Sequence, residues 1–163
     1  MILETPRLYL RHFRQEDAAR LSEYRNKKEV SYYQTWNKYS IIDAKRRIAH
    51  CLKNPDIKEK GNYQFAIILK DNDKLIGDLF VETDKSKSFV LGYTLDSDYW
   101  NLGIASEMVS AFLEYMKEEY HYSKVICYVY KDNERSLHLL KKLHFTKFSE
   151  SYFYDDEGYV KVL

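Results

Sequence analysis

The chain of 163 residues contains little cysteine, proline or glycine, with two, two and five residues of these types. Cys51 and Cys127 lie in unrelated contexts without a CxxC spacing, so we expect two buried thiols rather than a zinc site. No repeat or Pro/Gly-rich linker interrupts the sequence, and its length suits one hydrophobic core. We therefore expect a single domain over residues 1–163 without a bound metal.

The chain also lacks an excess of charge, because 26 Lys and Arg residues stand against 25 Asp and Glu residues. Such a balance is not typical of proteins that bind the phosphate backbone of nucleic acids. The amino-terminal segment "MILETPRLYLRHF" has no basic stretch followed by a long apolar run, so we expect neither a signal peptide nor a membrane anchor. We expect a cytoplasmic protein, monomeric or homodimeric, that binds neither nucleic acid nor membranes.

Hydrophobic periodicity in the first half of the chain predicts one strand, two helices and a meander. Alternating residues in "RLYLRHF" predict a strand, and "RQEDAARLSEYRNK" has helical spacing. A second helix is expected from Ser40 to about Asn54, because Ser40 and Asp43 can form a capping box and Pro55 ends the helix. Three apolar runs follow, "YQFAIILK", "KLIGDLFVE" and "SFVLGYTL", and the turn residues between them predict an antiparallel meander.

The second half alternates helices and strands. A long amphipathic helix follows the meander, and "KVICYVY" is apolar on both faces, which predicts a central strand covered on both sides. "NERSLHLLKKLHF" predicts another helix, and the last residues predict two strands around "DDEG". We therefore expect an α+β fold in which helices flank a mixed, mostly antiparallel sheet of six or seven strands.

The long helix begins in an unusual way, with the segment "DYWNLGIASEMV", Asp98–Val109. The free backbone N–H groups of a helix start carry partial positive charge and attract anions. Gly103 lets the backbone approach a ligand closely, and Ala105 and Ser106 keep the first turn free of bulk. Asn101–Ser106 thus have the pattern of a pyrophosphate cradle, without the lysine that the GxxxxGK[ST] loop of nucleotide hydrolases requires.

Three segments together resemble the GCN5-related N-acetyltransferase (GNAT) family, in its ribosomal-protein acetyltransferase branch. "YWNLGIASEM" is similar to the acetyl-CoA motif Q/R-x-x-G-x-G/A, which this branch often writes YWGKGYATEA. Asn133, Ser136, Lys142 and Phe145 match a second motif, N-x-x-S-x-x-x-x-x-K-x-G-F, in which His144 replaces the glycine and implies a left-handed backbone. The opening "LETPRLYLRHFRQEDAARL" resembles that of the branch, so the resemblance spans nearly the whole chain.

The resemblance implies a GNAT fold whose fourth and fifth strands splay apart, and direct transfer of an acetyl group from acetyl-CoA to a primary amine. It implies that the pantetheine arm lies against strand-edge amides at Tyr93, Thr94 and Leu95. Asn133 and Ser136 are expected to face the cofactor too, although both also suit a helix start. The residues implied for the pyrophosphate are Trp100, Asn101, Leu102, Gly103, Ile104, Ala105 and Ser106.

The usual groups for proton transfer are missing. Many relatives have Glu where this chain has Val90, and the tyrosine that several branches use as general acid is Leu140 here. The candidate bases are then Asp78 and Glu82, which share one face of a strand, or a water held by Tyr93. The alternative interpretation of both carboxylates is solvent-facing charge. Ser136 is the candidate acid.

The acceptor is open between two classes of amine. Residues 1–60 hold 14 basic and 8 acidic residues, and "YYQTW" adds aromatic surface, which favours a peptide amino terminus or an amino-acid-like amine. Acidic residues at Asp78, Glu82 and "DDEG" argue instead for a polyamine or aminoglycoside. A catalytically silent acetyl-CoA-binding module is the remaining alternative, because Val90 and Leu140 replace the usual proton-transfer groups.

Overall fold

The computed structural model describes all residues 1–163. There are two short 3-10 turns: η1 (Gln15–Asp17) leads into the first helix, and η2 (Ser97–Tyr99) lies in the segment before the long helix at Ile104–Tyr120. The strands and helices follow in the order β1 (Leu3–Glu4), β2 (Leu8–His12), α1 (Ala18–Arg25), α2 (Lys28–Ser31), α3 (Ile41–Lys53), β3 (Gly61–Leu69), β4 (Lys74–Thr83), β5 (Ser88–Leu95), α4 (Ile104–Tyr120), β6 (Lys124–Tyr130), α5 (Glu134–Lys142), β7 (Thr146–Ser151) and β8 (Asp156–Val162).

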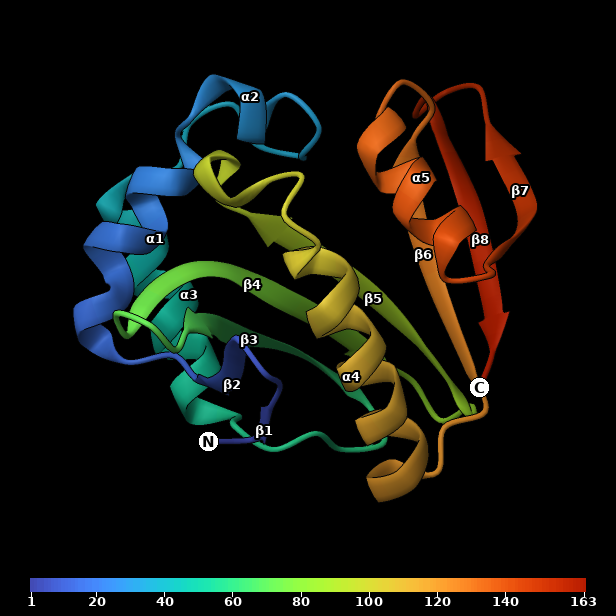
Figure 1. The fold of residues 1–163 in the computed structure, drawn as a ribbon, viewed down its shortest axis with the longest axis horizontal. Coiled ribbons are helices and arrows are strands. Elements are labelled where there is room, and N and C mark those ends of the chain that lie inside the picture. Colours follow the sequence, from blue (N-terminus) through green and yellow to red (C-terminus); the bar gives the residue numbers. More distant parts are fainter.

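All eight strands form one sheet in the order β1-β2-β3-β4-β5-β6-β8-β7 (Figure 1). Every neighbouring pair is antiparallel except β5 and β6, which run parallel. The expected α+β class and mostly antiparallel sheet are confirmed. The two-residue strand β1 adds an eighth strand, and the single-turn helix α2 is too short to be visible as a periodic pattern.

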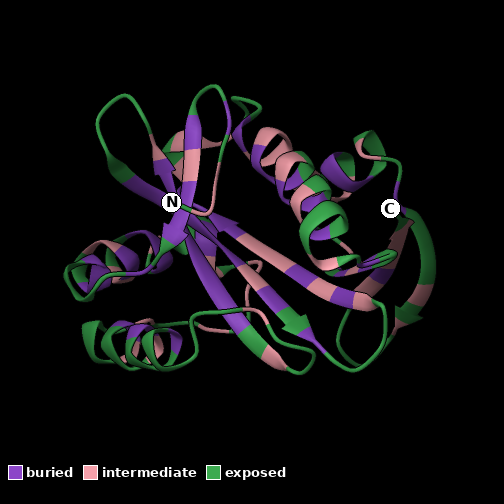
Figure 2. Ribbon diagram, turned by 90° about the horizontal axis from the view of Figure 1, so that it is seen from below, coloured by how far each residue is buried: buried purple, intermediate pink, exposed green.

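Helices cover the two faces of the sheet unequally. Helix α4 packs on one face over a core of 23 buried residues, while α1 and α3 pack on the other face of β2–β4 over a core of ten. Figure 2 shows α1 and α3 on one side of the sheet and α4 and α5 on the other. No helix is long and apolar enough to span a lipid bilayer.

Strands β5 and β6 pair over a short stretch and then separate. Residues 88–90 of β5 pair with residues 124–126 of β6, although β5 continues to Leu95 and β6 to Tyr130. The two strands diverge toward the top of Figure 1. The expected splay between the fourth and fifth long strands is confirmed, and it leaves one edge of β5 without a strand partner from Leu91 onward.

Two expectations for the last third of the chain are wrong. Strand β6 is covered on one face only, because α1 and α3 lie over β2–β4 and no helix covers Tyr128, which is 54% exposed. The turn of the last hairpin is residues 152–155 rather than "DDEG", since β8 begins at Asp156. The aromatic side chains of Tyr152, Phe153 and Tyr154 therefore occupy an exposed turn.

Two local features predicted from the sequence are the helix cap at Ser40 and the left-handed backbone at His144. Ser40 caps α3 by accepting a hydrogen bond from the Asp43 amide at 3.1 Å, and Asp43 accepts one from the Ser40 amide at 2.9 Å. His144 has a φ of 64°, the left-handed conformation expected where relatives have glycine. The capping box and the left-handed residue are thus both confirmed.

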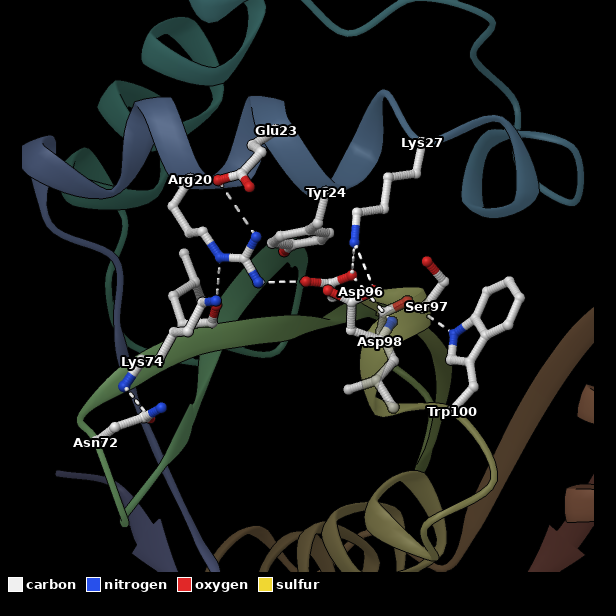
Figure 3. Close-up of polar contacts among 12 residues, drawn as sticks. Arg20, Glu23, Tyr24, Lys27, Asn72, Lys74, Asp96, Ser97, Asp98 and Trp100 are labelled. Atoms are coloured by element: carbon white, nitrogen blue, oxygen red, sulfur yellow. Dashed lines mark hydrogen bonds and ion pairs between the residues drawn. The ribbon is translucent and has the colours of Figure 1, made fainter.

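A buried carboxylate fixes the end of β5 to helix α1 (Figure 3). Asp96 is fully buried; Lys27 Nζ lies 2.6 Å from one of its oxygens, and the Arg20 guanidinium pairs with the other. Asp96 also accepts a hydrogen bond from the Asp98 amide, which starts the η2 turn. Burial opposes ionisation, but hydrogen bonds from Lys27 and Arg20 hold the pKa of Asp96 below its ordinary value of 3.8.

We expect Asp96→Asn to lower the free energy of unfolding by about 3 kcal/mol, because Arg20 and Lys27 would lose their buried counter-charge. Asp98→Asn is the matched control: Asp98 pairs with the same Lys27 Nζ at 3.1 Å, but its side chain is 70% exposed. Removal of an exposed partner should cost less than about 1 kcal/mol. Urea unfolding of both variants measures the difference, and equal losses would contradict the assignment.

The same pair predicts a pH dependence. Because the pKa of Asp96 is lower in the folded state, its stabilisation is complete above the unfolded-state pKa and is lost as the pH falls below about 4. The wild-type advantage over Asp96→Asn in urea midpoint should therefore shrink between about pH 5 and pH 3. A constant difference over this range would contradict the expected linkage.

Candidate active site

The loop before α4 leaves a run of backbone N–H groups without protein partners. Asn101 and Gly103 have φ angles of 60° and 75°, and α4 begins at Ile104. None of the six amides of residues 101–106 donates a hydrogen bond to a protein acceptor; the first α4 bond from this loop is Glu107 N–H to the Gly103 carbonyl. Consecutive free amides at a helix start make a binding site for an anion.

These amides face a cavity of about 340 Å³, the cofactor-side cavity, which lies between α4 and α5. Arg135 and Lys142 are the charged residues in its wall, and no carboxylate lines it. The Arg135 guanidinium lies 3.3 Å from the centroid of the Trp100 ring. The full lining is Tyr93, Leu95, Tyr99, Trp100, Asn101, Gly103, Ile104, Ala105, Ser106, Arg135, Ser136, His138, Leu139 and Lys142. This combination of amides and cations suits a phosphate-bearing ligand.

Residues at the amino terminus hold the outer side of the cradle. Arg7 pairs with Glu107 in the first turn of α4 at 2.7 Å and donates to the Leu102 carbonyl at 2.8 Å. Thr5 donates to the same Glu107 carboxylate at 2.6 Å. The loop that carries the free amides is therefore fixed by the turn between β1 and β2, as well as from α1 through Asp96.

A second cavity of about 190 Å³, the acceptor-side cavity, lies where β5 and β6 have separated. Tyr93 and Ser136 belong to the walls of both cavities. The remaining lining is Tyr33, Gln34, Thr35, Leu91, Gly92, Cys127, Tyr128, Val129, Tyr130, Asn133 and Asp156. The splay thus joins two cavities at a pair of hydroxyl groups.

Both Tyr93 and Cys127 are kept protonated by their surroundings. The Tyr93 hydroxyl is buried without a hydrogen-bond partner in the protein. Burial raises the pKa of Tyr93 well above its ordinary value, and the neighbouring Cys127 adds to the shift. Burial also raises the pKa of Cys127 to about 12. At neutral pH the phenol and the thiol are therefore both protonated, and a protonated thiol is a poor nucleophile.

Most residues expected to bind the cofactor line the cofactor-side cavity, but three of them do not line it. Thr94 is buried and lines neither cavity, because it points to the sheet face opposite Tyr93 and Leu95. Leu102 is 54% exposed and contributes its carbonyl to Arg7 instead. Asn133 caps α5 by accepting a hydrogen bond from the Ser136 amide at 3.3 Å, and it lines the acceptor-side cavity only.

The two candidate bases lie outside both cavities. Asp78 is buried, not solvent-facing, and its carboxylate accepts hydrogen bonds from Arg25 at 2.7 Å, Gln64 at 2.6 Å and the Tyr24 hydroxyl. It is therefore engaged in joining β4 to α1. Glu82 is exposed and lines a separate small cavity with Val90. Neither carboxylate lies where an acceptor amine would meet Tyr93 and Ser136.

Arg135, His138, Leu139 and Lys142 are additional residues of the cofactor-side cavity. They lie on α5, so the whole inner side of that helix contributes to the wall. Lys142 was visible as a motif position, whereas Arg135 was not. The contact of Arg135 with Trp100 joins α5 to a loop more than 30 residues earlier in the chain, so it depends on tertiary packing and leaves no local sequence pattern.

Comparison with known proteins agrees with this arrangement. Residues 7–146 match the family described as "Acetyltransferase (GNAT) domain". The chain is a GNAT acetyltransferase. This acetyltransferase is 32% identical over 149 residues, 90% of its own length and 83% of the other, to the "uncharacterized N-acetyltransferase YoaA" of Bacillus subtilis.

The solved structures show that the same fold extends to more distant proteins. A putative ribosomal-protein-serine acetyltransferase of Vibrio cholerae superposes with a TM-score of 0.83 at 18% identity, over 98% of this acetyltransferase and 96% of that chain. The ribosomal L7/L12 acetyltransferase RimL in complex with coenzyme A superposes with a TM-score of 0.82 at 16% identity, over 99% and 97%. Acetyltransferases of the GNAT fold use acetyl-CoA as the acetyl donor.

We expect Gly103→Val to weaken coenzyme A binding about tenfold, since a β-branched residue resists a φ of 75° and would turn the free amides of the cradle. A Cβ at this position meets only Arg7 Nη2, at 3.5 Å, so the variant should still fold. Leu102→Ala is the matched control, because this exposed side chain lies outside the cavity. Calorimetric titration with coenzyme A checks both; an unchanged affinity for folded Gly103→Val would refute the cradle.

Proposed function

We propose that this acetyltransferase transfers the acetyl group of acetyl-CoA directly to the primary amine of a peptide amino terminus or an amino-acid-like molecule. One observation carries the proposal: two cavities meet at Tyr93 and Ser136, where β5 and β6 have separated. A donor held in one cavity and an acceptor held in the other would have their reacting atoms at this junction. Proximity of this kind is a major source of rate acceleration.

The cofactor-side cavity fits acetyl-CoA by its chemistry. In our proposal the free amides of residues 101–106 bind the pyrophosphate, and Arg135 and Lys142 add positive charge. The unpartnered edge of β5 beyond Val90 offers backbone groups to the amide-rich pantetheine arm. Acetyl-CoA supplies an acetyl group on a thioester when it is bound.

Tyr93 and Ser136 are the proposed proton donors. Transfer of the acetyl group forms a C–N bond and breaks the thioester C–S bond. The leaving thiolate takes up a proton, and the amine nitrogen releases one to water. The raised pKa of Tyr93 keeps its phenol protonated, and its hydroxyl has no competing partner in the protein. Tyr93 is the proposed donor because its free hydroxyl lies at the junction of the cavities, with Ser136 beside it.

A peptide or amino-acid acceptor is supported by the walls of the acceptor-side cavity. The basic residues of segment 1–60 do not line it; that segment contributes the uncharged Tyr33, Gln34 and Thr35. A single carboxylate, Asp156, lines the cavity, which suits one ammonium group better than a polycation. Tyr128 and Phe148 extend an exposed aromatic surface beside it, with ring centroids 6.4 Å apart. The names of the RimL-type neighbours point to protein amino termini as well.

The proposal is tested by measuring thiol release from acetyl-CoA with a panel of amines. Trialanine, single amino acids, spermidine and kanamycin should be compared at equal concentration, and trialanine or an amino acid should be acetylated fastest. Far faster acetylation of spermidine or kanamycin would overturn the choice of acceptor. Coenzyme A binding without thiol release for any amine would favour a catalytically silent module instead.

We expect Tyr93→Phe to lower kcat about 100-fold, because a positioned proton donor typically contributes 10² or more. The free energy of unfolding should not fall, since the hydroxyl has no hydrogen-bond partner to lose. Cys127→Ala is the matched control in the neighbouring wall: its protonated thiol takes no part, so kcat should stay within about threefold of wild type. Steady-state kinetics with trialanine measure both values, and a larger loss for Cys127→Ala would indicate an acyl-enzyme route.

A further inference from the structure

We infer that Asp156 is the acceptor-binding carboxylate, which holds the ammonium group of the incoming amine opposite Tyr93 and Ser136. This inference rests on the proposed function and adds a residue to it. Asp156 is the first residue of β8 and lines the acceptor-side cavity. It was expected in a hairpin turn, so its place in the wall of the site follows only from the register of the last two strands.

The register of the sheet places Asp156 on the acceptor side. Asp156 is paired with Tyr130 of β6, and side chains of directly paired residues lie on the same face. On β6 the buried residues Val125, Cys127 and Val129 face α4 and α5, so Tyr130 and Asp156 face the other side. Asp156 therefore lies on the sheet face away from the cofactor-side cavity.

The carboxylate of Asp156 has no partner within the protein. It accepts no side-chain or backbone hydrogen bond and belongs to no ion pair, in contrast to the engaged carboxylates Asp78 and Asp96. Lys131, which follows Tyr130, pairs with Glu150 at 2.7 Å and lies over the Tyr152 ring. This half-buried carboxylate is therefore free to accept hydrogen bonds from a cation that comes from outside the protein.

Asp156 is also the only carboxylate in the wall of the acceptor-side cavity, and no lysine or arginine lines it. The other titratable side chains in this wall are the phenols of Tyr33, Tyr93, Tyr128 and Tyr130 and the thiol of Cys127. A second observation points to a ligand in the same place, because the buried Tyr93 hydroxyl also lacks a partner. An amine between these two groups would contact a carboxylate on one side and a phenol on the other.

The chemistry of this wall selects the class of acceptor. One carboxylate among phenols binds one ammonium, and the exposed rings of Tyr128 and Phe148 beside it offer contact to an apolar or extended peptide chain. A polycation would bring further positive charges to a surface with no second carboxylate in the cavity. We therefore assign Asp156 the recognition of a single terminal amine.

The test uses the full chain and two substitutions one residue apart. Asp156→Asn removes the charge without breaking an intramolecular contact. Asp155→Asn removes the same charge from the adjacent turn position, where φ is 54° and asparagine is well tolerated. Trialanine binding to each protein saturated with coenzyme A is measured by calorimetry, and the KM values for trialanine and acetyl-CoA are measured by thiol release.

Asp156→Asn should weaken trialanine binding and raise its KM at least tenfold, with the KM for acetyl-CoA unchanged, while Asp155→Asn should resemble wild type. Asp156→Glu should recover part of the trialanine affinity, since the charge is retained. Unchanged trialanine binding by Asp156→Asn, equal effects of both substitutions, or no trialanine binding to the wild type would overturn the inference. Failure of the proposed function appears differently, as peptide binding without acetylation of any amine.

Discussion

The site depends on the short parallel contact between β5 and β6. Three residue pairs, from Ser88 with Lys124 to Val90 with Ile126, hold the two halves of the sheet together. Past Val90 the antiparallel partners on either side, β4 and β8, keep each strand extended, so the strands separate without unfolding. The opening therefore requires no strained segment. It arises because β5 pairs with β4, and β6 with β8, along most of their lengths, whereas β5 and β6 pair with each other at three positions only.

The fully buried carboxylates serve the scaffold and lie outside the two cavities of the site. Asp78 and Asp96 are both enclosed near the α1 side of the sheet, and each has an arginine from that helix. Arg25, held by Asp78, also stacks on Trp36 and Tyr39, with distances of 4.3 Å and 4.7 Å to the ring centroids. The loop that supplies Tyr33–Thr35 to the acceptor side is thus anchored through a buried ion pair rather than by a regular element.

Local rules predicted much of the fold and part of the site. The strands at residues 88–95 and 124–130 and the capped start of α3 follow from neighbouring residues, and so they could be predicted. The uncovered face of β6 could not, because apolar residues on both faces of a strand do not reveal where helices end. Asp78 shows the same limit. The sequence pattern of a carboxylate on a strand is the same whether its side chain faces solvent or, as here, pairs with an arginine from a helix. Contacts such as Arg135 with Trp100 depend on tertiary packing alone.

The contacts of Thr5 and Arg7 with Glu107 close a loop of about one hundred residues around the start of α4. Thr5 and Arg7 lie in the turn between β1 and β2, and β1 is a two-residue edge strand with few ladder bonds of its own. Edge strands of this length are among the first parts of a protein to open. Opening of β1 and the turn that carries Arg7 would release the cradle while the rest of the sheet stays intact. A ligand bound at the start of α4 should therefore also slow amide hydrogen exchange in the β1–β2 segment.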